Sequence, residues 1–260
     1  MSVVQTEVIG NVGYIHLDRP ERMNAITVEL GRELELALRE LGGREDVNVV
    51  VVRGRGGNFC VGGDFQEVER LREGGPQALA PLFDNFSAAC TAVGDIDAPV
   101  VAVVEGCAMA GGFEFMLAAD VVLVRDEAKI ADNHSNFGQL PGGGSSQRLP
   151  RLVGRQRAMG HILTGDRLSG RDAADWGVAY RSYPADEFEA GVDAVVAGLA
   201  AKRRDALVGI KRLVRRGLTT TLEDGLALER SAVIAHIAGD AGGAGVSNFN
   251  SRSTPTRGNR

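Results

Sequence analysis

Short apolar runs and amphipathic stretches alternate along the first two-thirds of the chain. Residues 3–9 and 12–17 alternate apolar and polar positions on either side of a Gly-Asn pair, which predicts two strands joined by a hairpin turn. The β-branched runs at 47–52 and 100–104 have the composition of strands buried on both faces. Because helical patterns separate these runs, the sequence predicts an α/β fold.

Helices are predicted between these strands. One carries an apolar stripe at helical spacing and ends at a Gly-Gly pair, which is typical of a helix packed on a sheet; its apolar positions are Leu30, Leu34, Ala37, Leu38 and Leu41. Further helices are expected at roughly 65–72, up to about residue 93, and at 113–119. Two more short strands are expected at 121–124 and 178–181.

The chain after about residue 186 shows only helical patterns. We therefore expect a core of residues 1–195 followed by a helical region of residues 196–238. Residues 239–260 are rich in Gly, Ser, Asn and Thr, which predicts a poorly ordered tail. The expected caps of a short helix and of the last helix are Ser169 with Asp172 and Thr221 with Asp224.

Composition and charge narrow the possible functions. The 260 residues are 44% hydrophobic and carry a formal net charge of -5, which argues against a protein that binds nucleic acid through its phosphates. The three cysteines have no C-x-x-C spacing, so neither a disulfide framework nor a cysteine zinc site is indicated. Residues 1–10 lack a signal pattern and no apolar run reaches membrane-spanning length, so we expect a cytoplasmic protein.

Candidate chemistry lies where the apolar strand at 100–104 leads through glycines into a helix. The Gly111-Gly112 pair allows backbone N–H groups to approach a ligand, and N–H groups at a helix start suit an oxyanion. Glu114 follows one turn later, within reach of whatever these groups bind. A Walker-type phosphate loop is not indicated, because Gly112 and Phe113 stand where Lys and Ser/Thr should follow. A glycine turn without function is the alternative interpretation.

A second glycine-rich loop lies at 53–64, again between a strand and a helix, about 48 residues before the first. It is either a flexible connection or a second set of N–H donors. Residues 129–147 form an irregular, glycine-rich segment of the kind that is either mobile or a binding loop.

Five segments in register resemble the crotonase (enoyl-CoA hydratase/isomerase) superfamily. They are similar to its patterns NRPxxxNAL, FxAGADI, NGxAxGGGxE, PxxGGTQRL and LTGxxxxAxxAxxxGLV, and lie at 18–25, 59–64, 105–114, 141–149 and from 163 onward. The resemblance implies a crotonase-type spiral of β-β-α turns with a C-terminal helical trimerisation region. The expected assembly is a homotrimer or a dimer of trimers.

The resemblance also implies an acyl-CoA thioester as substrate, with no metal and no cofactor other than the CoA of the substrate itself. By position, the backbone N–H groups of Gly63 and Gly111 would form the oxyanion hole and Glu114 would be catalytic. The residues expected to contact CoA or the substrate are Arg22, Gly63, Asp64, Phe65, Gln66 and Gly111. The variable stretch 71–86 is expected to supply the wall of the acyl pocket.

His134 occupies the position of the second glutamate that hydratases of this family use. In one interpretation it replaces that glutamate as acid or base, since its ordinary pKa is near 6.5, and enoyl-CoA hydration survives. In another, the pair serves double-bond isomerisation or hydrolysis of a β-keto C–C bond. In a third, His134 only forms hydrogen bonds within its loop. Asp132 is a lesser candidate for the same role.

Other residues are given structural roles at this stage. Asp120 is expected to cap or orient the next strand, and His16, His161 and His236 to be structural or on the surface. The family ending DxxEGxxAFxEKRxPxF is echoed only by Phe249, Arg252 and Pro255, so a CoA contact from the tail is not expected. The favoured function is an enoyl-CoA hydratase-type lyase. A binding protein on the same fold is the alternative of a different class.

Overall fold

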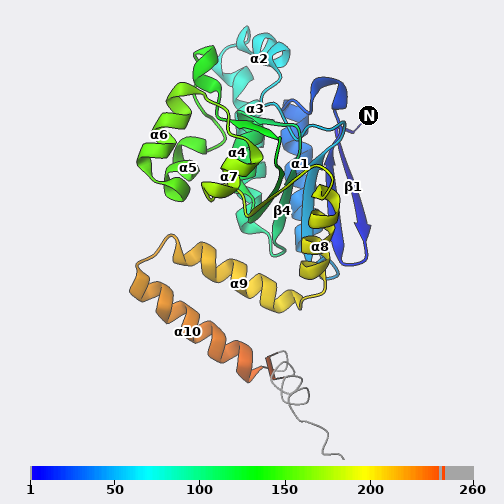
Figure 1. Cartoon of the computed structure of the whole chain (residues 1–260), viewed down its shortest axis with the longest axis vertical. Coiled ribbons are helices and arrows are strands. Elements are labelled where there is room, and N and C mark those ends of the chain that lie inside the picture. The colour runs from blue at the N-terminus through cyan, green and yellow to red at the C-terminus, as the bar shows by residue number, and fades with distance from the viewer. Residues whose placement is uncertain (1, 240–241, 244–260) are drawn as a thin grey trace, which may run out of the picture. The chain divides into compact units, whose positions relative to one another are not determined.

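The computed structural model describes residues 2–239 and 242–243 (Figure 1). The chain divides into two compact units, residues 1–204 and 205–260. The first unit contains a six-stranded sheet in the order β1-β2-β3-β4-β6-β8, made of β1 (Val4–Ile9), β2 (Val12–Leu17), β3 (Val49–Gly54), β4 (Val100–Val104), β6 (Val121–Arg125) and β8 (Arg181–Tyr183). A smaller sheet pairs β5 (Cys107–Met109) with β7 (Lys129–Ala131).

Helices connect and cover these strands. The first unit contains η1 (Pro20–Arg22), α1 (Val28–Gly43), α2 (Phe65–Arg72), α3 (Pro76–Asp95), α4 (Gly111–Ala118), η2 (His134–Phe137), α5 (Ser145–Val153), α6 (Arg155–Thr164), α7 (Gly170–Asp175) and α8 (Phe188–Ala200). The remaining helices are α9 (Arg204–Gly217) and α10 (Leu222–Ala238).

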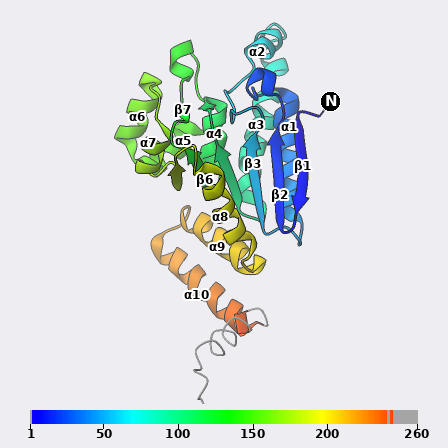
Figure 2. The ribbon, with the colours of Figure 1, turned by 45° about the vertical axis from the view of Figure 1, so that its right-hand side comes forward.

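The large sheet is parallel except for its first pair. β1 and β2 form the predicted antiparallel hairpin, and Gly10 at the turn has a φ of +58°. From β2 onward each strand runs parallel to its neighbour, and β1, β2 and β3 lie side by side in Figure 2. The predicted hairpin and central strands are therefore confirmed.

The two central strands are buried on both faces, as their β-branched composition predicts. Val50 and Val52 point into one apolar core, and Val49 and Val51 point into another. The second core is completed by one face of α8. Burial of the side chains at 49–52 and 100–104 explains why these stretches show an apolar run rather than an alternating pattern.

A second layer of short pairings runs across the ends of the main strands. Gly63 bridges to Ile26, Cys60 bridges to Ala108 of β5, and Ile130 of β7 bridges to Leu168. The chain therefore repeats one path: it leaves a long strand, makes a short pairing in this layer, and enters a helix. This is the β-β-α spiral that the sequence resemblance implies.

Helices α1 and α3 approach each other closely, and α3 contributes to the site described below. A Cβ at Gly31 of α1 would lie 2.9 Å from the backbone nitrogen of Phe86 in α3. The glycine therefore allows the backbones of α1 and α3 to come together. Leu30, Leu34 and Leu38 of the predicted stripe are buried in the same core.

Two local expectations are wrong in detail. The late strand begins at Arg181 instead of 178, because the N–H groups of Val178 and Ala179 bond to the carbonyl of Ala173 at the end of α7. The segment 129–147 is not irregular throughout, because it contains β7, η2 and the start of α5.

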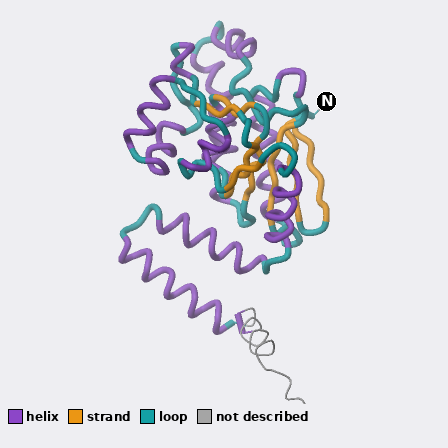
Figure 3. Tube along the Cα trace, viewed as in Figure 1, coloured by secondary structure: helices purple, strands orange, loops and turns teal. Residues whose placement is uncertain are grey.

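After β8 the described chain is helical (Figure 3). The capping box of Ser169 and Asp172 opens α7, and Thr221 accepts a hydrogen bond from the Asp224 N–H at the start of α10, both as predicted. Apart from residues 239 and 242–243, the predicted tail lies outside the described residues, as do Phe249, Arg252 and Pro255. Within the described ranges, none of the helices is long and apolar enough to cross a membrane.

The three cysteines and Asp120 have structural roles. Cys60, Cys90 and Cys107 are free thiols, and burial raises the pKa of both Cys60 and Cys90 to about 12. Asp120 accepts a hydrogen bond from the Val100 N–H at 2.8 Å. It therefore caps the start of β4.

Asn24 ties the first predicted motif to the loop after β3. Its side chain is fully buried, accepts a hydrogen bond from the Arg19 N–H at 2.9 Å, and donates to the carbonyls of Arg55 and Asn58 at 3.0 and 2.8 Å. Its φ of +58° is a conformation that asparagine tolerates better than most residues.

We expect Asn24→Ala to lower the free energy of unfolding by about 1–3 kcal/mol, because it leaves buried backbone groups without partners. Urea unfolding followed by circular dichroism measures this loss. Asn11→Ala is the matched control, since Asn11 is exposed and donates one hydrogen bond to Asp46; a change within about 0.5 kcal/mol is expected there. Equal free energies of unfolding for the two variants would contradict this structural role of Asn24.

Candidate active site

The two predicted glycine turns lie against each other. Gly111 is the first residue of α4, and a Cβ built on Gly62 would lie 2.7 Å from the Ala110 Cβ and 3.3 Å from the Gly111 nitrogen. Gly63 and Gly111 line the same pocket. Among the hydrogen bonds of the described residues, neither the Gly63 nor the Gly111 N–H has an acceptor within the chain. Both amides are therefore available as donors.

Ala110, just before Gly111, has an unusual backbone conformation. Its φ of +47° and ψ of −116° lie in a region that L-residues rarely adopt. The Ala110 N–H donates to the carbonyl of Ala131 in β7 at 2.9 Å, which helps to hold this geometry. The strained residue fixes the direction in which the first amides of α4 point.

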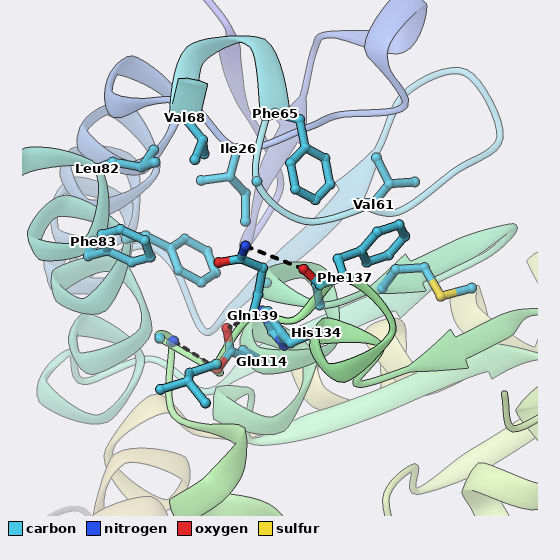
Figure 4. A pocket seen from close by; sticks show the side chains of 18 of the residues that line it. Ile26, Val61, Phe65, Val68, Leu82, Phe83, Glu114, His134, Phe137 and Gln139 are labelled. Atoms are coloured by element: carbon cyan, nitrogen blue, oxygen red, sulfur yellow. Dashed lines mark hydrogen bonds and ion pairs between the residues drawn. The ribbon is translucent and has the colours of Figure 1, made fainter. Parts of the chain in front are cut away.

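The pocket has a volume of about 320 Å³ and mostly apolar walls. Its only ionisable lining residues in the described chain are Glu114 and His134. Figure 4 shows these two side by side, with aliphatic and phenylalanine side chains around the rest of the cavity. The apolar wall comes from several elements and includes Ile26, Phe65, Val68, Leu82, Phe83, Phe86 and Phe137.

Glu114 is held by the start of α5. Its side chain is 2% exposed, and its Oε1 accepts hydrogen bonds from three consecutive backbone amides: Gly143 at 2.7 Å, Gly144 at 2.8 Å and Ser145 at 3.1 Å. A Cβ at Gly143 would lie 2.8 Å from Oε2, so glycine is needed for this close approach. The glycine-rich segment is thus an ordered binding loop for the protein's own carboxylate.

His134 faces Glu114 across a short gap. Its Nε2 lies 3.9 Å from Glu114 Oε2, and its Nδ1 lies 2.6 Å from Asp132 Oδ1. Burial acts to lower the pKa of His134, but the hydrogen bond to Asp132 and the negative charges of Asp132 and Glu114 outweigh it. The pKa of His134 is therefore raised above its ordinary 6.5, which favours the imidazolium form.

Asp132 is more central than the sequence indicated. Its side chain is fully buried, its Oδ1 receives the His134 Nδ1–H, and its Oδ2 receives the Ser145 hydroxyl. Burial acts to raise the pKa of Asp132, but the hydrogen bonds from His134 and Ser145 outweigh it, so this pKa lies below its ordinary value. An ionised Asp132 must accept, so the Nδ1 of His134 donates and Nε2 points toward Glu114.

His161 lies behind Asp132. Its Nε2 accepts the Asp132 N–H at 3.1 Å, and its ring packs against Phe113 and Trp176. Burial lowers the pKa of His161, which keeps the ring neutral and able to accept. The expected structural role is thus specific, since this histidine fixes the backbone next to His134.

Of the residues predicted to contact CoA, Gly63, Phe65 and Gly111 line the pocket, and Arg22, Asp64 and Gln66 do not. Arg22 donates to Gln66 at 2.9 Å, and both are exposed. Phe65 is 58% exposed and its ring lies 5.5 Å from that of Phe137. Asp64 pairs with Arg19 at 2.8 Å and caps the start of α2, so its carboxylate already has partners within the chain. A role of these residues toward CoA stays a prediction.

Sequence reasoning missed Ser145. The pattern PxxGGTQRL has glycine where this chain has Ser145, so the signal was a departure from the family pattern inside a matched motif. Ser145 is fully buried and contacts both Glu114 and Asp132. The departures at positions 134 and 145 therefore meet at one carboxylate.

The chain is similar to known proteins over most of its length. The sequence profile of the enoyl-CoA hydratase/isomerase family matches residues 7–256. A Mycobacterium leprae protein named probable enoyl-CoA hydratase is 32% identical over 220 residues, which are 84% of this chain and 83% of that protein. A Bacillus subtilis protein named as an enoyl-CoA hydratase/isomerase is 30% identical over 85% of each chain.

A solved structure shows the same fold. The enoyl-CoA hydratase from Polaromonas sp. JS666 superimposes with a TM-score of 0.92 at 28% identity, covering 97% of this chain and 98% of that one. With a family match over nearly the full length and a shared fold, this chain belongs to the enoyl-CoA hydratase/isomerase family.

Proposed function

We propose that the protein adds water to the Cα–Cβ double bond of an enoyl-CoA thioester. The observation that carries this proposal is the pair of Glu114 and His134, 3.9 Å apart, in a pocket that two unpaired backbone amides also line. The names of the relatives support the same reaction.

The amides of Gly63 and Gly111 bind the thioester oxygen. As water adds at Cβ, negative charge develops on this oxygen in the enolate. Donors that are already oriented stabilise that charge without reorganisation, and loss of one such donor typically costs about 2.7–4 kcal/mol of transition-state stabilisation. Both donors come from rigid turns, and this favours orientation before the substrate arrives.

Glu114 and His134 divide the proton transfers. Glu114 Oε2 accepts a proton from water while the water oxygen bonds to Cβ, and Oε1 stays bound to the amides of Gly143, Gly144 and Ser145. The His134 imidazolium then donates its Nε2 proton to Cα, which neutralises the enolate. Transfer of the proton from Glu114 to His134 across the gap restores the starting state.

The same residues also suit isomerisation, in which a proton moves between two carbons and no water is consumed. The family contains both activities by its name. The raised pKa of His134 favours its role as an acid, which supports hydration over a mechanism in which a neutral His134 activates water against a β-keto carbon.

The acyl group is apolar and uncharged in this proposal. The pocket wall carries no ionisable side chain other than Glu114 and His134 among the described residues, so a second carboxylate on the acyl chain would be buried without a partner. No cofactor besides the CoA of the substrate takes part. A homotrimer or dimer of trimers and a cytoplasmic location remain proposals from the family resemblance and the cysteine pattern.

We expect wild-type protein to consume crotonyl-CoA or a medium-chain enoyl-CoA, and Glu114→Gln and His134→Ala each to lower kcat by about 10²-fold or more. Loss of the conjugated thioester absorbance in the ultraviolet measures turnover. His16→Ala is the matched control, since His16 pairs with Glu7 outside the pocket. Full activity of His134→Ala would show that Glu114 acts without it, and wild-type binding without turnover would favour the binding-protein alternative.

Phe83 sets the length of the acyl pocket in our proposal. A Cβ at Gly142 would lie 2.9 Å from its ring, so the ring lies against the loop that precedes α5. We expect Phe83→Ala to lower the KM of long-chain enoyl-CoA relative to that of short-chain enoyl-CoA. A panel of acyl chain lengths measures this preference.

A carboxylated acyl-CoA tests whether the acyl group must be uncharged. Rapid turnover of this thioester by the wild type would contradict an uncharged acyl group.

A further inference from the structure

Asp132 has a complete set of partners although it is fully buried. Its two oxygens accept hydrogen bonds from His134 Nδ1 and from the Ser145 hydroxyl, and its N–H donates to His161. A buried carboxylate is costly unless each oxygen is paired, and a fully paired one fixes the groups around it. The side chain therefore has one available orientation, and so does the imidazole that it holds.

Ser145 connects the two sides of the site. Its N–H donates to Glu114 Oε1 at 3.1 Å, and its hydroxyl donates to Asp132 Oδ2. Ser145 is the first residue of α5. This one residue therefore holds both Glu114, the proposed base, and Asp132, which supports the proposed acid His134. Neither Asp132 nor Ser145 lines the pocket, so both act through other side chains.

We propose that Asp132 and Ser145 are positioning residues for the hydration proposed above: Asp132 holds His134 with Nε2 toward Glu114, and Ser145 sets the separation of His134 and Glu114. This inference rests on the proposed function. Asp132 selects the tautomer of His134 and supplies the negative charge that keeps the imidazolium protonated. Ser145 keeps Asp132 from rotating away from the imidazole.

The charged groups that act on His134 are few. Asp132 lies at its Nδ1 and Glu114 beyond its Nε2, and both stabilise the imidazolium. On α6, His161 accepts a hydrogen bond from the backbone N–H of Asp132, and burial lowers its pKa and keeps it neutral. The neighbouring pocket residues Asn133, Phe137 and Gln139 carry no charge. Removal of the Asp132 charge should thus change the protonation of His134 more than any other single substitution outside the pocket.

Asp132→Asn tests the first half of the proposal, because it keeps the shape and removes the charge. We expect kcat for enoyl-CoA hydration to fall by about 10-fold or more, with KM little changed. The basic limb of the pH profile of kcat/KM, which reports loss of the His134 proton, should move to lower pH. Asp120→Asn is the control, since Asp120 caps β4 and should leave the profile in place. An unchanged kcat and profile in Asp132→Asn would overturn the proposal.

Ser145→Ala tests the second half, because it keeps the N–H that binds Glu114 and removes the hydroxyl. We expect a several-fold fall in kcat with an unchanged KM. The adjacent Ser146→Ala is the matched control, since Ser146 is exposed and contacts only Gln147 among the hydrogen bonds of the described residues. Equal kcat values for the two variants would contradict the role of the Ser145 hydroxyl. Circular dichroism checks that both remain folded.

A second readout separates this proposal from the proposed function. NMR titration of the His134 imidazole, assigned with His134→Ala, reports its pKa without turnover. We expect this pKa to be lower in Asp132→Asn than in the wild type, and an equal value would overturn the positioning role. If the wild type consumes no enoyl-CoA but the pKa of His134 falls as expected, hydration fails while the arrangement of Asp132 and His134 stands.

Discussion

The carboxyl group of Glu114 is buried, and the surrounding structure is arranged to satisfy its hydrogen bonds. Three consecutive amides at the start of α5 bind one of its oxygens, where the helix dipole also favours negative charge. This requires a loop without side chains next to Glu114, which explains Gly143. It also requires α4 and α5 to meet, and the pairing of β5, which precedes α4, with β7, which leads toward α5, brings their segments together. The second oxygen is left for chemistry.

The large elements follow directly from the sequence because their signals are local or repetitive. The apolar runs of β3 and β4 and the apolar stripe of α1 each indicate which of their own side chains are buried. The order of the five family motifs predicts the order of the turns of the spiral. β8 was misplaced because its start depends on two hydrogen bonds to the end of α7, a contact that residue types do not encode. The short pairings of the second layer involve single residues, such as Gly63 with Ile26, and carry no periodic pattern.

The site was partly predictable for a similar reason. Gly63, Gly111 and Glu114 stand in motifs, and His134 was assigned by its distance from one; all four line one pocket. Asp132 was ranked too low and Ser145 was missed, because their importance comes from a contact between segments 13 residues apart in a loop of irregular path. Considered together, the departures from the family pattern at positions 134 and 145 would have indicated that these two residues lie close together.

The contact between the two glycine turns also limits how the site can evolve. A methyl group on residue 62 would lie 2.7 Å from the methyl group of Ala110, which is too close for both to exist. Both positions have a positive φ, so neither accepts a side chain without strain. The pair therefore accommodates one methyl group in total. A lineage that gains alanine at 62 must first lose it at 110, so substitutions at these two glycine turns can occur only in that order.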